Sequence, residues 1–315
     1  MHIRTFFNKI KLIALGIAAF LLITANVYGA SNGIIAYSCR DSSGFQNICY
    51  INQDGTGNVQ MTFNQTGGAG LPTWAPTGKA LAYVDLNMKT GVIYVNTMNE
   101  DGSNVQQLVQ GVTPMWSPDG NWMAFSAPSS SGTPEIFIIE LNGSNLTQLT
   151  NAPGLVKIHP TWSPDSKSIV YAQYASNGRD VSLWEMTATG ANRHQLTTGT
   201  WFNRNANGQI ISSANEANSP DWNPTNNKIV FWSGGEIWTI NADGTGRTQL
   251  TNVANANNDD PEWSPDGKKI LFSTNRSGNG NNEMWVMNSN GSQQKKIVNN
   301  TASPMPGDAA WQPLP

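Results

Sequence analysis

The chain has 315 residues and a formal net charge of −3, from 18 Lys and Arg against 21 Asp and Glu. This weakly acidic balance excludes attraction to nucleic acid or to anionic lipid as the main basis of its function. Its two cysteines allow one internal disulfide at most.

Residues 1–29 have the pattern of a secretory signal peptide. Arg4, Lys9 and Lys11 precede an apolar run over residues 12–25, and Val27-Tyr28-Gly29 offers small residues where a signal peptidase cleaves. The apolar run is too short to favour a spanning helix, and an uncleaved anchor is the alternative. Cleavage would leave 15 basic and 21 acidic residues, a net charge of −6, with two histidines, too few for a multi-histidine metal centre.

The next segment predicts a β-hairpin that carries both cysteines. Its strands cover residues 34–37 and 48–51, with Cys39 at the end of the first strand and Cys49 at the start of the second. In an oxidising compartment this arrangement favours a disulfide that staples the hairpin. The alternative is a pair of buried thiols, and no histidine lies nearby to favour a metal site.

A tryptophan followed two residues later by a proline occurs six times along the chain. Successive tryptophans are 42, 46, 60, 41 and 48 residues apart. A period near forty residues, built from short strands, is typical of the blades of a β-propeller. The six anchors are Trp74-Ala75-Pro76, Trp116-Ser117-Pro118, Trp162-Ser163-Pro164, Trp222-Asn223-Pro224, Trp263-Ser264-Pro265 and Trp311-Gln312-Pro313.

The anchors are followed by a repeated order of turns and strands. A turn such as Pro118-Asp119-Gly120 comes first, because proline presets φ and Asp and Gly tolerate the conformations that close a turn. An apolar strand and an alternating strand such as Ile93-Tyr94-Val95 come next. An Asp-Gly or Asn-Gly pair then predicts a two-residue hairpin, and a short strand such as Gln148-Leu149-Thr150 ends the unit. Each unit is therefore predicted to hold four antiparallel strands.

The two ends of the chain predict a closed ring. Residues 33–64 contain a second, a third and a fourth strand but no first strand, whereas residues 308–313 supply a first strand alone. We therefore expect residues 30–315 to form an all-β, six-bladed propeller in which the C-terminal strand completes the N-terminal blade. Closure removes the exposed sheet edges that an open array would leave.

This repeat resembles that of the TolB-like propeller family, also described by its PD40 or WD40-like repeat. The family pattern reads Pro-x-Trp-Ser-Pro-Asp-Gly, then Ile-Ala-Phe, Ile-Tyr-Val and Leu-Thr strands, and the match covers residues 33–313. The resemblance implies a periplasmic protein that binds a partner such as a peptidoglycan-associated lipoprotein of the Tol-Pal envelope system. TolB has an α/β domain before its propeller, and we expect this chain to lack that domain.

Catalysis is not expected. Related repeats occur in propellers attached to serine peptidases of the prolyl oligopeptidase type, but those enzymes carry a separate α/β-hydrolase domain. The predicted ring leaves no residues to build such a domain. The alternative is a hydrolase or lyase that acts on a carbohydrate or peptide at the channel mouth, with His159 beside Asp260.

Polar residues precede the tryptophans where the innermost strands approach the propeller axis. The positions three residues before each tryptophan are Leu71, Thr113, His159, Ser219, Asp260 and Asp308. His159, Asp259, Asp260 and Asp308 are predicted to form an acidic arc at one mouth of the channel. Its carboxylates would suit calcium, which prefers oxygen ligands, or a basic loop of a partner protein, or simply a hydrated channel entrance. We predict no cofactor.

The stretch from Thr200 to Ala217 accounts for the longest spacing between tryptophans. A long excursion on a rigid scaffold often carries function, so Trp201 and Phe202 are candidate apolar anchors for a partner. The sequence as a whole predicts a periplasmic or secreted monomer that binds a protein in the cell envelope. It predicts no nucleic-acid binding and no transmembrane span after cleavage.

Overall fold

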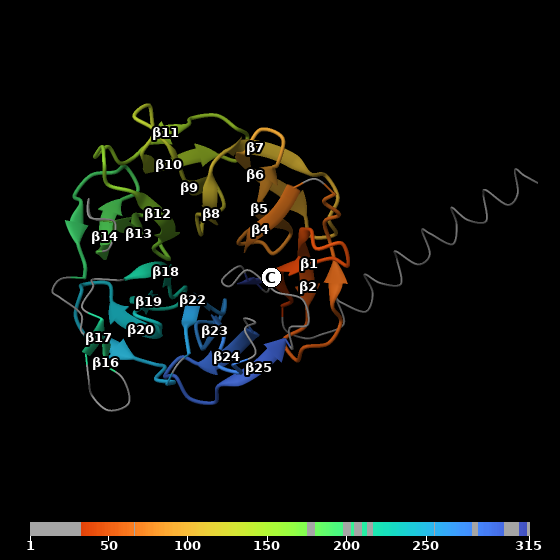
Figure 1. The fold of residues 1–315 in the computed structure, drawn as a ribbon. Helices are drawn as coiled ribbons and strands as arrows, with labels where there is room; N and C mark the ends of the chain where they lie inside the picture. The colour runs from red at the N-terminus through yellow and green to blue at the C-terminus, as the bar shows by residue number, and fades with distance from the viewer. Residues whose placement is uncertain are drawn as a thin grey trace, which may run out of the picture.

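The computed structural model describes residues 33–65, 67–174, 180–197, 217–254, 256–278, 283–298 and 309–313, with the backbone of 203–204 and 210–212. The predicted signal peptide, Trp201, Phe202 and Asp308 lie outside these residues. The described part is all-β, with its sheets arranged one after another around a common centre (Figure 1). Within it, no helix is long and apolar enough to cross a membrane.

The first strands of the chain pair with its last strand. They are β1 (Ile35–Arg40), β2 (Gln46–Ile51), β3 (Val59–Gln60) and β26 (Ala309–Trp311), in the order β26-β1-β2-β3. Ile35 of β1 lies opposite Trp311 of β26, and Ala36 lies opposite Ala310. The N- and C-terminal segments thus belong to one antiparallel sheet.

The following strands form antiparallel sets of four in chain order, as the repeat predicts. The second set contains β4 (Gly67–Trp74), β5 (Ala80–Asn87), β6 (Val92–Asn99) and β7 (Gln106–Gln110), and the third contains β8 (Val112–Trp116), β9 (Trp122–Pro128), β10 (Pro134–Glu140) and β11 (Thr147–Gln148). One parallel pair, Gln46 opposite Gly68, links the first set to the second.

The remaining sets repeat this arrangement. The fourth contains β12 (Lys157–Trp162), β13 (Ser168–Tyr174), β14 (Val181–Thr187) and β15 (His194–Gln195). A separate hairpin of β16 (Asn203–Arg204) and β17 (Ile210–Ser212) follows. The last two sets are β18 (Asn218–Trp222), β19 (Lys228–Ser233), β20 (Glu236–Asn241) and β21 (Thr248–Gln249), then β22 (Asn258–Trp263), β23 (Lys269–Thr274), β24 (Glu283–Asn288) and β25 (Lys295–Val298).

The anchor tryptophans join neighbouring sheets. Each ends the innermost strand of its sheet and is buried in an apolar cluster that two sheets share; Trp74, for example, packs with Ile34 and Tyr50 of the preceding sheet. Its indole Nε1 donates to the backbone oxygen of Ala310 at 3.2 Å. Trp116 repeats the contact with the oxygen of Thr73 at 3.1 Å. Burial of a large aromatic ring at each seam adds apolar contact area to the sheet-on-sheet packing.

The connection between the third and fourth strands of each set differs from the prediction. A two-residue hairpin was expected at Asp101-Gly102, but β6 ends at Asn99 and β7 begins at Gln106. The Asp101 carboxylate accepts a bond from the backbone N of Ser103 at 2.9 Å, and Gly102 adopts a φ of 80°. The Asp side chain thus closes its own turn, and a longer loop results.

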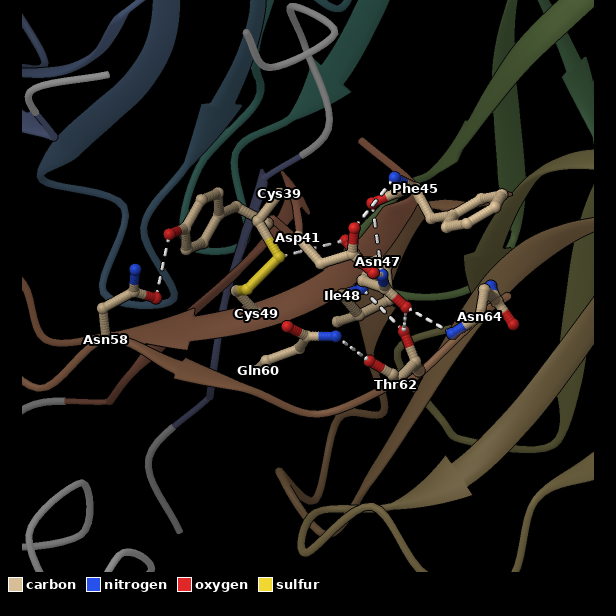
Figure 2. The surroundings of a disulfide bond; sticks show 11 residues. Cys39, Asp41, Phe45, Asn47, Ile48, Cys49, Asn58, Gln60, Thr62 and Asn64 are labelled. Atoms are coloured by element: carbon tan, nitrogen blue, oxygen red, sulfur yellow. Dashed lines mark hydrogen bonds between the residues drawn. A yellow bond between two sulfur atoms is a disulfide. The ribbon is translucent and has the colours of Figure 1, made fainter. Parts of the chain in front are cut away.

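Cys39 and Cys49 form a disulfide in the structure, with a sulfur–sulfur distance of 1.96 Å (Figure 2). The bond joins β1 to β2. Beside it, the fully buried Asn47 accepts bonds from the Thr62 hydroxyl at 3.1 Å and from the backbone N of Asn64 at 2.7 Å. The same corner of the sheet is therefore held by a covalent bond and by a satisfied polar cluster.

Candidate functional site

Five residues of the innermost strands share a left-handed backbone conformation. They are Leu71, Thr113, His159, Ser219 and Asp260, with φ values of 51°, 51°, 52°, 46° and 44°. We call them the axial residues. Each lies three residues before an anchor tryptophan and directly before a proline. A residue with a Cβ seldom adopts positive φ, and one before proline is normally extended, so these positions hold strained backbone.

The strain coincides with a bulge in each innermost strand. In β12, for example, the register against β13 shifts between Ile158 and Thr161. The shift recurs in β22 between Asp259 and Glu262. A bulge re-aims the side chains of the strand that carries it, and bulges are frequent beside functional sites.

The axial residues line a cavity of about 110 Å³ between the innermost strands. The proline after each of them also lines the cavity, as do Thr73, Met115, Asp221 and Glu262. The wall is mainly apolar around Leu71 and Met115. It is polar and acidic around His159, Asp221, Asp260 and Glu262. A concave site with a few converging polar groups is the usual form of a binding site.

Of the residues predicted to form the acidic arc, His159 and Asp260 line this cavity, whereas Asp259 is not among its lining residues. The Nδ1 atom of His159 lies 2.9 Å from Oδ1 of Asn218, whose amide group donates to the Tyr174 hydroxyl at 3.0 Å. Burial lowers the pKa of His159, so its imidazole is neutral at pH 7. Because Asn218 Oδ1 can only accept, Nδ1 of His159 carries the proton.

The two neighbouring aspartates are protonated in part near neutral pH. Burial raises the pKa of Asp259 to about 7, with a further contribution from the negative charge of Asp260. Burial also raises the pKa of Asp260 to about 6, against a hydrogen bond that the Ser219 hydroxyl donates to it at 2.5 Å. The cluster therefore gains negative charge as the pH rises through this range.

Two further carboxyl groups line the cavity and were not predicted. Asp221 and Glu262 each stand directly before an anchor tryptophan. Burial raises the pKa of Asp221 to about 7. Burial, together with the charge of Asp221, holds the pKa of Glu262 well above its usual range. The sequence carried a signal for them, because each has a fixed place in the repeat directly before an anchor tryptophan.

The calcium alternative finds no support among the residues that the structure describes. They contain no group of three or more His, Cys, Asp and Glu side chains placed to hold a metal ion. Asp259 and Asp260 are therefore not assigned as metal ligands. Asp308 lies outside the described residues, as do Trp201 and Phe202, so these three stay sequence predictions.

Radial four-stranded sheets, buried repeat tryptophans and a central cavity define the class of β-propeller proteins. The chain belongs to the family described as PD40, the TolB beta propeller domain, whose profile matches residues 26–211. The expected resemblance to TolB-like propellers is thereby confirmed.

The individual relatives are named either as a peptidase or as TolB. The chain is 26% identical to "Uncharacterized peptidase YuxL" of Bacillus subtilis, over 65% of this chain and 29% of that protein. It is 25% identical to "Tol-Pal system protein TolB" of Bordetella pertussis, over 49% of this chain and 35% of that protein. The chain thus spans about a third of the length of these curated relatives.

Among solved structures, TolB from Acinetobacter baumannii superposes with a TM-score of 0.70 at 19% identity. The superposition covers 89% of this chain and 66% of that one. At this identity the likeness concerns the fold.

Proposed function

We propose that this chain is an exported, non-catalytic propeller that binds a macromolecular partner of the cell envelope. Residues 1–29 would act as the signal peptide, and residues 30–315 would fold as one domain. Membership of the TolB beta propeller family supports a protein-binding role of this kind. A peptidoglycan-associated lipoprotein is the partner class that the family suggests, and we propose that the chain is a monomer in the periplasm or outside the cell.

We further propose that six blades close into a ring, with β26 completing the first blade. The pairing of β26 with β1 supports this closure. So does the side chain of Gln312, which reaches the second sheet by donating to the backbone oxygen of Gly78 at 2.9 Å. A closed ring would hold the axial residues in fixed positions, as a preorganised binding site requires.

The acidic side of the cavity carries the functional proposal. His159 and Asp260 lie there on strained backbone, with Asp259 next to Asp260 in the chain, and the ionised carboxylates of the two aspartates would attract a basic segment of the partner. Asp308, Trp201 and Phe202 are proposed as further contacts on the same mouth.

The test is capture of a partner from an envelope extract at pH 8, where Asp259 and Asp260 are both ionised. We expect the double variant Asp259→Asn/Asp260→Asn to fold and to lose affinity by about tenfold at low salt, or about 1.4 kcal/mol. The matched control is Asp165→Asn/Asp266→Asn, which removes the same charge from exposed turns. Equal capture by both double variants and the wild type would contradict the proposed site.

A channel-mouth hydrolase or lyase is the second candidate, favoured by the peptidase-named relative and by one contact. The Ser219 hydroxyl lies 3.5 Å from Nδ1 of His159 and donates to Asp260. However, Nδ1 of His159 already donates to Asn218, so it offers no lone pair to activate this serine. Turnover of a peptide or oligosaccharide by the purified protein would favour the enzyme.

A further inference from the structure

The polar side of the central cavity contains three side chains from consecutive sheets that contact one another. His159 of β12, Ser219 of β18 and Asp260 of β22 all line the cavity, and we call them the polar patch. The Ser219 hydroxyl oxygen joins the other two, because it lies 3.5 Å from Nδ1 of His159 and 2.5 Å from Oδ1 of Asp260. The patch is therefore one continuous part of the wall.

The protons of this patch are already engaged within the protein. Nδ1 of His159 donates to Asn218 at 2.9 Å, and the Ser219 hydroxyl donates to Asp260. Nε2 of His159 and Oδ2 of Asp260 have no hydrogen-bond partner in the described part of the chain, and neither belongs to its buried unpartnered atoms, so each reaches open space. With the lone pairs of the Ser219 oxygen, the patch offers three acceptors and no free N–H donor.

The charges around the patch favour a cationic ligand. None of the ion pairs in the described part of the chain includes Asp260, and neither Lys nor Arg lines the cavity. Asp221 and Glu262 add two more carboxyl groups to the same wall. A ligand must donate hydrogen bonds to satisfy the patch, and bonds from a charged donor to a carboxylate are the stronger ones.

The rest of the cavity has room for an apolar chain. Leu71 of β4 and Met115 of β8 line it, together with the prolines that follow the axial residues. One water needs roughly 10–15 Å³ of such space. A cavity of about 110 Å³ therefore holds several non-hydrogen atoms in a row. Lysine side chains commonly lay their methylene groups on apolar surface and keep the charged head in a polar environment.

We propose that this cavity binds the side chain of one lysine of the protein partner. The ammonium group has three N–H donors, which match the three acceptors of the polar patch, and its four-carbon stem lies against Leu71 and Met115. Arginine fits less well, because its planar guanidinium spreads five donors over a rigid fork. This inference rests on the proposed function, since it names the part of a basic segment that the site recognises.

The test is NMR titration of the purified protein with N-acetyl-lysine-N-methylamide, whose only charge is the side-chain ammonium. At pH 8, above the pKa of about 6 for Asp260, we expect saturable shifts of the methyl signals of Leu71 and Met115. The matching norleucine compound has the same four-carbon chain without the ammonium group, and it should bind at least about tenfold more weakly. Equal affinity for the two compounds, or no saturable shift with lysine, would overturn the inference.

Variants of the patch locate the binding. We expect Asp260→Asn to weaken binding of the lysine compound by about tenfold, because a neutral amide replaces the carboxylate that faces the ammonium group. The matched control is Asp266→Asn, which removes the same charge from an exposed turn and should bind like the wild type. Should Asp260→Asn fail to fold, Ser219→Ala removes another acceptor of the same patch. Wild-type affinity in a folded patch variant would contradict the assignment.

A second arm separates this inference from the proposed function. The wild-type protein is offered an envelope extract whose lysines have been acetylated, which removes their charge, beside an untreated extract. We expect acetylation to abolish capture. Equal capture from both extracts would overturn the lysine assignment and leave the proposed function standing. No capture from the untreated extract would contradict the proposed function, and binding of the lysine compound alone would then assign the cavity to a free amine.

Discussion

His159 keeps a backbone φ of 52° although a proline follows it, and the other axial residues do the same. Glycine adopts this conformation without steric cost, yet it stands at none of the five axial positions. Backbone held in a sparsely populated conformation clusters at binding and active sites, which supports the proposed use of this cavity.

The cysteine pair provides a prediction at the residue scale. If Cys39 and Cys49 are bonded in the exported protein, thiol titration of the denatured, unreduced sample should find no reactive thiol. Reduction should lower the free energy of unfolding by about 2–3 kcal/mol, because the bond closes a short loop in the unfolded chain. A variant with both cysteines replaced by serine is the control for the reduced state. Two reactive thiols in the untreated protein would refute the pairing.

Sequence reasoning reached some residues of the site and missed others for physical reasons. Counting back from the tryptophans located His159 and Asp260 because the repeat fixes their place in a strand. Asp221 and Glu262 were missed because only the third and fourth positions before the tryptophans were considered. The tautomer of His159 could not be predicted, since it depends on Asn218, 59 residues away in the next sheet.

At the scale of the strand, a threonine just after the short fourth strand hydrogen-bonds to the backbone of the third strand in four sheets. Thr62, Thr150, Thr197 and Thr251 accept bonds from the backbone N of Ile48, Ile136, Leu183 and Ile237 at 2.8–2.9 Å. In the third sheet the Thr150 hydroxyl also donates to the buried Glu135 at 2.5 Å. The threonine that ends these four repeats is thus a hydrogen-bonding element beside the short fourth strand.

Replacing Thr150 by Val tests this element. The change keeps the shape of the side chain but leaves the Ile136 amide and a Glu135 oxygen without a partner. We expect a loss of about 1–3 kcal/mol in the free energy of unfolding, measured in urea. Thr147→Val is the matched control, because Thr147 is exposed and its loss should change stability by less than about 0.5 kcal/mol. Equal losses for the two variants would contradict this role.

Strand order was predictable because the period, the turn residues and the alternation all agree within one repeat. The connections between third and fourth strands were not. Asp-Gly suggested a two-residue hairpin, but Asp101 and Asp243 accept bonds from the backbone two residues ahead. A side chain that caps its own turn competes with the hairpin geometry that the dipeptide favours in isolation.

At the scale of the whole molecule, stability depends on contacts between residues at opposite ends of the chain. The backbone N of Gln312 donates to the oxygen of Ile34 at 2.8 Å, and the buried Trp311 packs with Ile35 of β1 and Leu271 of β23. This pairing costs more loop-closure entropy than a hairpin does, because nearly the whole chain lies between the partners.

Removal of the last residues tests this closure. A chain that ends at Met305 loses β26, the Trp311 ring and the bonds to Ile34 and Glu262. We expect its free energy of unfolding to fall by about 3–5 kcal/mol or more, the usual cost of deleting a buried tryptophan, with a lower melting temperature in calorimetry. A chain that ends at Pro313 is the control and should melt like the wild type. The loss should extend beyond the first sheet, since both faces of the seam lose their neighbour. If the chain ending at Met305 melts at the wild-type temperature, the C-terminal strand does not close the ring.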